Sequence, residues 1–271
     1  MSEIFGFDAF SPAQIAARVE NVGVAKTRLP LLSLLMLSVL AGAFIGLGAL
    51  GFVLVKSDPS LGFATSQLLG GLTFSLGLIL VVVAGAELFT GNNLLALAWA
   101  DGKISTRDVL RNWAIVCTGN FIGAGGLALL VFLSHHPDMN NGAIAKAYLQ
   151  IAAAKVALPF WTAFFRGILC NVLVCMAMWM VLAGRSVLDK VVAVVFPISA
   201  FVAAGFEHSI ANMYLIPLAM LLQTFDGAQA ANGITWLGFI GNLAPVILGN
   251  IIGGSVLVGL VYYVIYRRAP E

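Results

Sequence analysis

Six long apolar segments dominate the sequence and lie at residues 31–55, 67–100, 109–134, 157–183, 188–222 and 239–266. A helix that crosses a lipid bilayer needs about 20 mostly apolar residues, so each segment is long enough for one crossing. Charged residues make up 10% of the 271 residues, which is too few for the surface of a protein in water. We therefore predict an all-α polytopic membrane protein with six transmembrane helices in contact with the lipid bilayer. A soluble enzyme and a nucleic-acid-binding protein are excluded.

The second and fifth apolar segments are too long for one helix and carry polar interruptions, GAELFTGNN at 85–93 and GFEHSIAN at 205–212. Parts of the sequence also recur. Gly85, Glu87 and Asn92 match Gly205, Glu207 and Asn212 at an offset of 120, and GNFIG at 119–123 matches GNIIG at 249–253 at an offset of 130. The pattern predicts two repeats, each with one broken helix, so that spans two and five are the broken ones.

Each predicted repeat holds three spans, so the second repeat must lie upside down relative to the first. We place the first repeat at 31–134 and the inverted second repeat at 155–266, within a single membrane domain, 1–271, that begins with a cytoplasmic amphipathic segment, 1–28. Inverted repeats with a broken helix in each half are typical of transport proteins whose binding site lies at the middle of the membrane. Transport is therefore the function that the pattern favours.

The N-terminal segment carries the signals of a short amphipathic helix. Ser11 and Pro12 are typical of a helix N-cap and of the first helical position. Ile15, Val19 and Val22 follow at helical spacing, so we expect this helix to lie at the membrane interface. Two roles remain open for it: an anchor with no other function, or a gate over the inner mouth of a pore.

The basic residues orient the chain, because cytoplasmic loops of membrane proteins carry an excess of Lys and Arg. With the N-terminus inside, the outer loops hold two basic residues, Lys56 and Lys146. The inner segments then hold ten, namely Arg18, Lys26, Arg28, Lys103, Arg107, Arg111, Arg185, Lys190, Arg267 and Arg268. We therefore predict a multi-pass membrane protein with both termini in the cytoplasm.

Three ionisable residues lie in the interruptions of the broken spans and are candidate functional residues, because ionisable groups are costly inside a bilayer. His208 can exchange a proton near neutral pH, so it could attract an anion and protonate it, or it could bond loop carbonyls in the neutral form. Glu87 and Glu207 could bind cations or carry protons. Their symmetric positions favour a structural role instead, in which each carboxylate accepts backbone N–H groups that its helix break leaves free.

The roles of the uncharged residues near the breaks are less well defined by the sequence. The Thr90 hydroxyl could bond a permeating anion or its own loop, and Asn92 and Asn212 are expected to hold the breaks together. Phe74 and Leu78 share one helix face, where they could form an apolar constriction or pack against other helices.

The fourth span brings three further polar residues. Lys155, at its outer end, is either a lysine whose ammonium reaches the interface or a cation that concentrates anions at a pore mouth. Asn171 lies more than four turns deeper and could donate a hydrogen bond within the pore. Arg166 also lies inside this span, and the sequence suggests no partner for it.

Several of these stretches together closely resemble the formate/nitrite transporter family. The motifs that carry the resemblance are FSLGLIL at 74–80, GAELFTG at 85–91, RGILCN at 166–171, AGFEHSIANM at 204–213 and GNIIGG at 249–254. The stretch 206–213 is the most specific of them, and the resemblance covers essentially the whole chain.

The resemblance implies an aquaporin-like protomer whose two breaks meet at the pore centre, and a homopentamer with one pore in each protomer. It implies that His208 is the central anion site and proton donor, that Thr90 faces it, and that Lys155 and Asn171 belong to the pore. It assigns the apolar constrictions on either side of the histidine to five residues, Phe74, Leu78, Phe89, Val174 and Phe201.

Within the family, the chain looks most similar to the formate branch, notably in GRSVLDK at 184–190 and at the C-terminal end, 262–267. Formate and protons are therefore the expected partners. Nitrite, hydrosulfide, acetate and lactate stay open, because all are small anions of weak acids. TGNN at 90–93 and Arg166 depart from the formate pattern.

Other classes of membrane protein fit less well. A redox subunit with haem held by two histidines needs a pair in the membrane, whereas His135 and His136 fall in a loop and leave His208 alone. Lys155 and Thr90 distinguish an anion pathway from a channel for ammonia or water. We expect no cofactor and no metal ion, and we expect the cysteines, which lie in apolar runs, to form no disulfide.

Overall fold

The structure of the chain is a computed structural model, and it describes residues 9–225 and 233–268. These residues form helices joined by short turns, with no strand among them. Residues 1–8 of the predicted N-terminal segment lie outside the described residues. The elements are α1 (Pro12–Thr27), α2 (Leu31–Lys56), α3 (Phe63–Leu80), η1 (Val81–Gly85), η2 (Gly91–Leu94), α4 (Leu95–Ala100), α5 (Thr106–Leu133), η3 (His136–Asp138), α6 (Ala143–Val156), α7 (Phe160–Val181), α8 (Val187–Ala203), α9 (Ser209–Phe225), α10 (Trp236–Ile251), η4 (Ile252–Leu260) and α11 (Val261–Tyr266).

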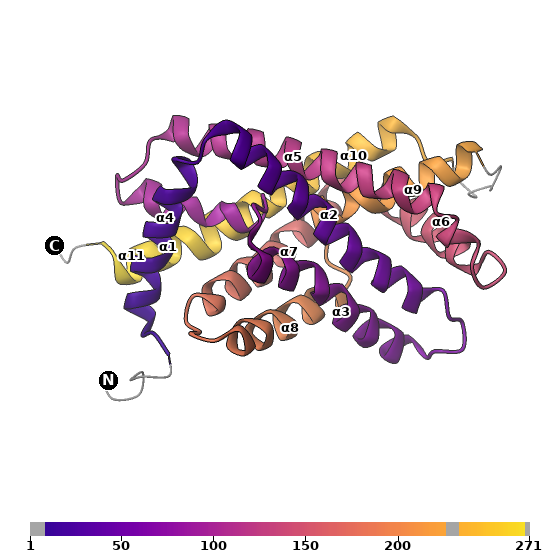
Figure 1. The fold of residues 1–271 in the computed structure, drawn as a ribbon, viewed down its shortest axis with the longest axis horizontal. Coiled ribbons are helices and arrows are strands. Elements are labelled where there is room, and N and C mark those ends of the chain that lie inside the picture. The colour runs from indigo at the N-terminus through magenta and orange to yellow at the C-terminus, as the bar shows by residue number, and fades with distance from the viewer. Residues whose placement is uncertain (1–8, 226–232, 269–271) are drawn as a thin grey trace.

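The helices form an elongated bundle (Figure 1). The helices α1, α4 and α11 gather at one end, which we call the α1 end, and α6 lies at the opposite one, which we call the α6 end. The turn between α7 and α8 also belongs to the α1 end, because the backbone N–H of Phe10 donates to the carbonyl of Ala183 at 3.1 Å.

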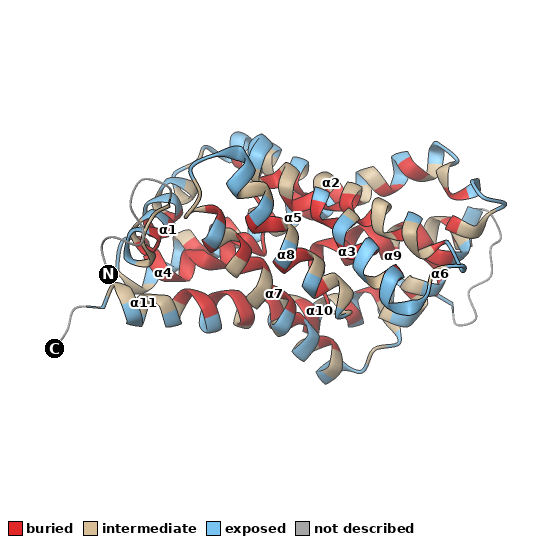
Figure 2. Cartoon of the chain, turned by 90° about the horizontal axis from the view of Figure 1, so that it is seen from below, coloured by how far each residue is buried: buried red, intermediate tan, exposed pale blue. Residues whose placement is uncertain are grey.

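The outer surface of the bundle suits a lipid environment. Within the described ranges, five helical segments are long and apolar enough to cross a membrane: Leu31–Lys56, Phe63–Gly85, Thr106–Leu133, Phe160–Val181 and Trp236–Tyr266. The helix Ser209–Phe225 is apolar but shorter. Buried residues line the interior of the bundle and exposed ones its outside (Figure 2), where large apolar side chains such as Phe196 and Leu237 are uncovered. These features support a multi-pass membrane protein.

Capping boxes fix the start of three helices. The hydroxyls of Ser11, Ser105 and Ser186 accept a backbone N–H at the beginning of α1, α5 and α8, and a side chain three residues on bonds back to each serine N–H. Such reciprocal bonds satisfy donors that a helix start leaves unpaired. The predicted N-cap at Ser11 and first helical position at Pro12 are confirmed.

At the repeated GNxxG motif, neighbouring helices pack so closely that a side chain would not fit between them. At Gly123, α5 approaches the carbonyl of Val39 on α2, and at Gly253 the chain after α10 approaches the carbonyl of Ile168 on α7. A Cβ at either position would collide with that carbonyl. The repeated GNxxG motif therefore marks backbone-to-backbone contact, which is common where membrane helices associate through small residues.

The first helix packs against other helices of the chain. α1 packs on α4, α5 and α11, with Ile15, Val19 and a charged residue, Glu20, fully or nearly fully buried. Val22, expected on the same face, is 38% exposed. The helix thus lies against protein, since its buried face is covered by the rest of the bundle.

Candidate functional site

Two interruptions of the helical path lie at equivalent places in the two halves of the chain. In the first, η1 ends at Gly85 and the next helical turn begins at Gly91; in the second, α8 ends at Ala203 and α9 begins at Ser209. Gly85 and Gly205 have φ of 81° and 70°, a conformation that residues with a Cβ rarely adopt. Each glycine therefore lets the chain leave the helix axis at its break.

The two interruptions contact each other through His208 and Thr90. The Nε2 atom of His208 lies 3.2 Å from Oγ1 of Thr90, and both residues are almost fully buried. The other ring nitrogen, Nδ1, accepts the backbone N–H of Ala211 at 3.1 Å, so His208 also caps the start of α9. Since Nδ1 is an acceptor, a neutral ring carries its proton on Nε2 and donates it to Thr90.

Two phenylalanines hold the imidazole from the side. The Phe201 ring lies roughly parallel to it at 5.8 Å between centroids, and the Phe74 ring meets it edge-on at 6.4 Å. The two phenylalanines also contact each other at 5.7 Å. With Lys155 and Glu207 among the other lining residues, they enclose a cavity of about 90 Å³ that reaches His208 from the α6 end.

The charged groups of this cavity are joined in a chain of polar contacts. Nζ of Lys155 lies 2.8 Å from Oε1 of Glu207, and the other carboxylate oxygen accepts Nδ2 of Asn212 at 2.7 Å. That amide nitrogen also donates to Oδ1 of Asn242, and Nδ2 of Asn242 donates to the carbonyl of Lys155. Lys155 is therefore a paired cation, whose field at a distance is reduced by the carboxylate.

An equivalent chain lies at the first interruption. Nζ of Lys26 lies 2.9 Å from Oε1 of Glu87, and Nδ2 of Asn92 donates to Oε2 of Glu87 at 2.7 Å and to Oδ1 of Asn112 at 2.9 Å. Lys26 comes from α1 and Lys155 from α6. The match extends to the sequence, since KTRLP at 26–30 and KVALP at 155–159 end these two helices at an offset of 129. Lys26, Asn112 and Asn242 were not among the predicted site residues.

The predicted structural role of the two glutamates was wrong in its partners. Their carboxylates bond lysine and asparagine side chains, as above. The freed backbone groups are instead satisfied by Asn120 and Asn250: their Oδ1 atoms accept the N–H of Phe89 and of Ser209, and their Nδ2 atoms donate to the carbonyls of Glu87 and Glu207. These are the asparagines of the repeated GNxxG motif, so the motif carried the signal although it was interpreted only as a repeat.

Asn171 connects the first interruption to α10. Its Nδ2 lies within hydrogen-bond distance of the Thr90 carbonyl (3.2 Å), Oδ1 of Asn93 (2.7 Å) and the Asn250 carbonyl (2.6 Å). Its Oδ1 has no partner among the described residues. An amide nitrogen has two hydrogens, so these three acceptors already use the donating capacity that the sequence assigned to an anion.

The predicted constriction residues fall into two groups. Phe74 and Phe201 line the cavity around His208. All five residues belong to one buried apolar cluster. Leu78, Phe89 and Val174, however, do not line the cavity around His208, nor a larger cavity that lies at the α1 end. Phe89 packs edge-on against Trp113 of α5, at 6.3 Å between centroids.

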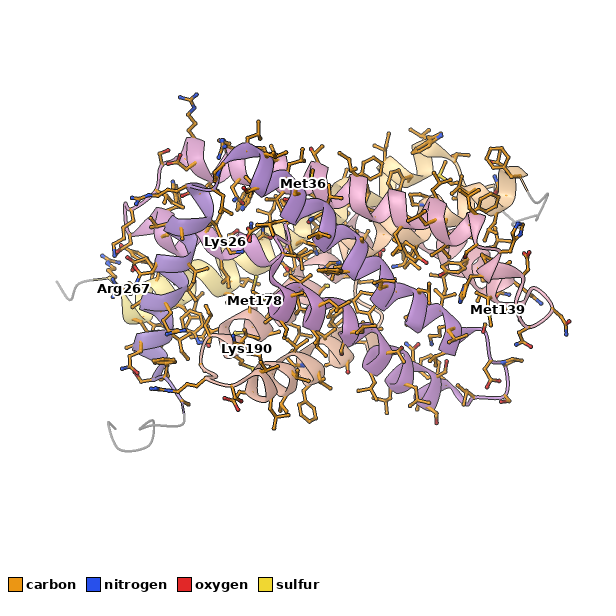
Figure 3. The ribbon with its side chains drawn as sticks, viewed as in Figure 1. Lys26, Met36, Met139, Met178, Lys190 and Arg267 are labelled. Carbon is orange, nitrogen blue, oxygen red and sulfur yellow. The ribbon has the colours of Figure 1, made fainter. Side chains whose placement is uncertain are left out.

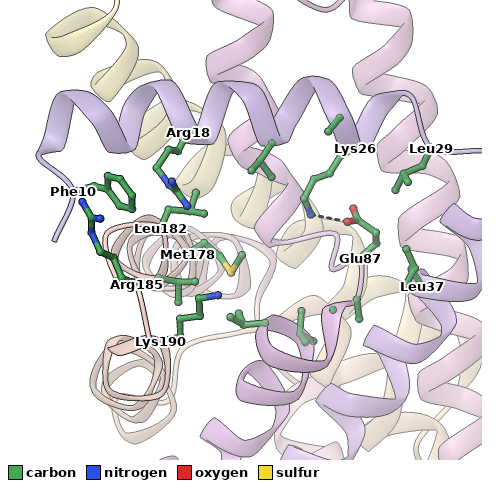
Figure 4. A pocket seen from close by; sticks show the side chains of 18 residues that line it. Phe10, Arg18, Lys26, Leu29, Leu37, Glu87, Met178, Leu182, Arg185 and Lys190 are labelled. Atoms are coloured by element: carbon green, nitrogen blue, oxygen red, sulfur yellow. Dashed lines mark ion pairs between the residues drawn. The ribbon is translucent and has the colours of Figure 1, made fainter. Parts of the chain in front are cut away.

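A second, larger cavity of about 750 Å³ opens at the α1 end. Figure 4 shows it beneath α1, with the ion pair of Lys26 and Glu87 on its wall. Figure 3 places Lys26, Lys190 and Arg267 at this end of the bundle and Met139 at the other.

Other polar candidates lie away from the two interruptions. Arg166 lies on the exposed side of α7, where its side chain makes no ion pair or hydrogen bond with the described residues; its carbonyl accepts the N–H of Glu207. Cys117, Cys170 and Cys175 are free. Within the described ranges, no group of three or more His, Cys, Asp and Glu side chains could hold a metal ion.

The profile of formate/nitrite transporters matches residues 13–264 of this chain. The chain belongs to the formate/nitrite transporter family. The resemblance that the motifs indicated is therefore confirmed, and it covers nearly the full length of the sequence.

Relatives in this family are known as channels and transporters. The chain is 40% identical to the formate channel FocA of Escherichia coli K12, over 98% of this chain and 97% of that protein. It is 37% identical to the formate channel FocB of the same organism, with 99% of each chain covered. Both relatives are named as formate channels, which agrees with a transport function for the family.

Two solved structures have the same fold. A structure described as a pentameric formate channel with formate bound superposes with a TM-score of 0.82 at 38% identity, covering 88% of this chain and 98% of that one. A second, described as an ion channel of the same family, gives a TM-score of 0.83 at 31% identity, with 95% and 99% covered.

Proposed function

We propose that each protomer forms a pore for formate, in which His208 is the anion site and proton donor. The contact between His208 and Thr90 carries this proposal, because it joins the two helix interruptions in a buried place walled by Phe74 and Phe201. An anion that reaches the ring from the cavity passes Lys155 and Glu207 on the cavity wall and then meets the histidine between the two phenylalanines.

The hydrogen bond from Ala211 makes His208 a ready proton donor once the ring is charged. A second proton on the ring must go to Nδ1, which then loses the N–H of Ala211 and points its own hydrogen at that donor. The positive end of the α9 dipole also opposes a charge there. A protonated His208 is therefore destabilised unless an anion is close. Transfer of one ring proton to the anion produces a neutral acid that can cross the apolar walls, and the neutral ring regains the hydrogen bond from Ala211 once its remaining proton lies on Nε2.

The paired lysines guide anions toward this centre. Lys155 and Lys26 stand on opposite sides of the interruptions, each held by a glutamate, so an approaching anion meets an oriented ammonium group without a large net charge to trap it. Asn171 contributes by holding the Thr90 loop in place through the Thr90 carbonyl.

We further propose six transmembrane spans, with the second and fifth broken and the two repeats inverted in an aquaporin-like protomer, five of which assemble as a homopentamer. The pentameric channel among the similar structures supports the assembly. The basic residues of the α1 end support an orientation with both termini in the cytoplasm, here of a bacterial inner membrane.

Formate is the proposed substrate because FocA and FocB, to which the chain is 37–40% identical, are formate channels. Nitrite, hydrosulfide, acetate and lactate are the alternatives within the family. The cavity of about 90 Å³ beside His208 favours formate, nitrite and hydrosulfide over the larger acetate and lactate.

Flux measurements on proteoliposomes test the proposal. We expect uptake of formate above that of empty liposomes, faster at lower pH, and lower rates for nitrite, hydrosulfide, acetate and lactate measured side by side at two pH values. His208→Asn keeps a polar side chain and removes the titratable group, so it should flatten the pH dependence, while His136→Asn in the loop should not. Uptake equal to that of empty liposomes would refute formate passage, and an unchanged pH profile in His208→Asn would refute proton donation by the ring.

A further inference from the structure

The cavity at the α1 end is larger than passage of formate requires. Its volume is about 750 Å³, against about 90 Å³ for the cavity at the α6 end. Cavities of roughly 300–1,000 Å³ are of the size that holds drug-sized ligands, whereas formate is a one-carbon anion. The α1 end therefore has room for an occupant other than the permeating ion.

The charged lining of this cavity is strongly basic. Among the described residues that line it, the basic ones are Arg18, Lys26, Arg185 and Lys190, and the acidic one is Glu87. Lys26 and Glu87 already form an ion pair at 2.9 Å. The three other basic residues share this space, and no second carboxylate lies among the described residues that line it.

Two of these cations have side chains available for a ligand. The ammonium of Lys190 makes no ion pair or hydrogen bond with the described part of the chain, and the guanidinium of Arg18 lies 4.1 Å from the centre of the Phe10 ring. Figure 4 shows Arg18 pointing down from α1 and Lys190 reaching up from the opposite wall. The guanidinium of Arg185 lies 4.2 Å from the same Phe10 ring, so positive groups from α1 and from the start of α8 converge on one place.

The pseudo-symmetry of the fold does not account for this charge. Lys26 has its counterpart in Lys155, but the position equivalent to Arg18 is Ala147 and the position equivalent to Lys190 is Gly70, from the offsets of 129 and 120. The cavity at the α6 end has Lys155 and Glu207 as its charged lining residues. The extra basic groups are therefore specific to one mouth and are not needed to build the repeat.

We propose that the cavity at the α1 end binds a soluble polyvalent oxyanion, carrying two or more negative charges, which obstructs formate at that mouth. Guanidinium groups bind such oxygens in pairs, and an ammonium adds a point charge. A concave site of one sign with apolar walls also concentrates counter-ions. The blocking role rests on the proposed function, since it requires that this cavity lies on the formate path, but the binding itself does not.

Binding is tested by calorimetry on the detergent-purified protein with inorganic pyrophosphate and citrate as probes. We expect saturable binding, weakened by salt, and weaker by about tenfold in Arg18→Gln and in Lys190→Gln. Arg18→Lys keeps the charge and should bind better than Arg18→Gln, and Lys146→Gln, an exposed lysine of α6, should bind like the parent. Monodisperse elution and an unchanged Tm establish that each variant is folded. Binding that is absent, or that Arg18→Gln and Lys190→Gln leave unchanged, would overturn the proposal.

The blocking role is tested by formate flux with pyrophosphate on one side of the membrane at a time. Inhibition is expected from the side of the α1 end alone, and less of it in Lys190→Gln. Flux of the parent without probe is measured first, so a failure of formate passage is distinguished from a failure of the anion site. Pyrophosphate binding with no inhibition from either side would refute obstruction.

Discussion

The hydrogen bond between His208 and Thr90 has a defined direction, because Nδ1 of the ring is occupied by the N–H of Ala211. Thr90→Val keeps the shape of the side chain and removes the acceptor, which leaves the Nε2–H buried without a partner at a cost of about 1–3 kcal/mol. We expect formate flux to fall by roughly tenfold. Thr90→Ser should retain most of the flux. Radiolabelled formate uptake would measure this, and parent-like uptake by Thr90→Val would show that the hydroxyl is not used.

The side chain of Asn250 forms more hydrogen bonds to backbone groups than the side chain of any residue of the predicted site. It accepts the N–H of Ser209 and donates to the carbonyls of Glu207 and Gly167. Asn250→Ala leaves these buried groups unpaired, each costing about 1–3 kcal/mol, so we expect Tm to fall by about 5 °C or more. Asn21→Ala, at an exposed position of α1, is the matched control and should not lower Tm. Equal Tm values for the two variants would contradict the role of Asn250.

The residues of the site were predictable where one short motif held them, and much less so where the contact joins distant segments. His208, Phe74 and Thr90 lie in quoted motifs and Phe201 was implied by the family resemblance. The structure brings the other three residues around His208. The partners of Glu87 could not be found in the same way, since Lys26 belongs to another helix and its reach depends on how α1 packs. A carboxylate near a helix break has several possible donors, and the sequence does not rank them.

At the scale of elements, a buried carboxylate ties α1 to the rest of the α1 end. Glu20 is fully buried, and Nε of Arg267, just after α11, lies 2.7 Å from its Oε2. Lys103, in the turn before α5, contacts the other oxygen. Three elements distant in sequence therefore meet at one acidic side chain, which explains why a charged residue lies on the buried face of this amphipathic helix.

Glu20→Gln should loosen α1. Removing one partner of a fully buried ion pair costs about 3–5 kcal/mol, but Arg267 and Lys103 are 28% and 42% exposed and can turn toward water, so we expect roughly 1–3 kcal/mol. The measurement is the rate of trypsin cleavage after Arg28, which should rise, while Asn21→Gln on the exposed face should leave it unchanged. Cleavage at the parental rate in Glu20→Gln would show that other contacts hold the helix.

The apolar runs predicted the boundaries of the long helices well, but they did not predict the short helix α6. The first span was expected at 31–55, and α2 occupies Leu31–Lys56. The helix α6 was not expected, because its 14 residues are too few for a crossing and it has no side-chain N-cap, with Gly142 before it in a left-handed conformation. The structure shows that α6 positions Lys155 beside Glu207.

At the scale of the whole molecule, the repeat is more extensive than the sequence matches suggested. Gly85 and Gly205 share a positive φ, and the pairs Glu87 and Glu207, and Asn120 and Asn250, have equivalent contacts in the two halves. The correspondence continues to the helices α1 and α6 that precede them. Each half thus supplies its own lysine, carboxylate and asparagines. The breaks differ where they meet, since the histidine has a leucine, Leu88, at the equivalent position.

The orientation of the molecule gives a final prediction. Ten basic residues were assigned to the inner side, and the segments that carry them lie at the α1 end, so this end should face the cytoplasm. Leu188→Cys and Arg107→Cys are exposed at that end, and Ser60→Cys and Met139→Cys at the other. A membrane-impermeant maleimide added to intact cells should label the second pair, and added to inverted vesicles it should label the first. The opposite labelling would place both termini outside and would require Lys155, rather than Lys26, to meet anions leaving the cell.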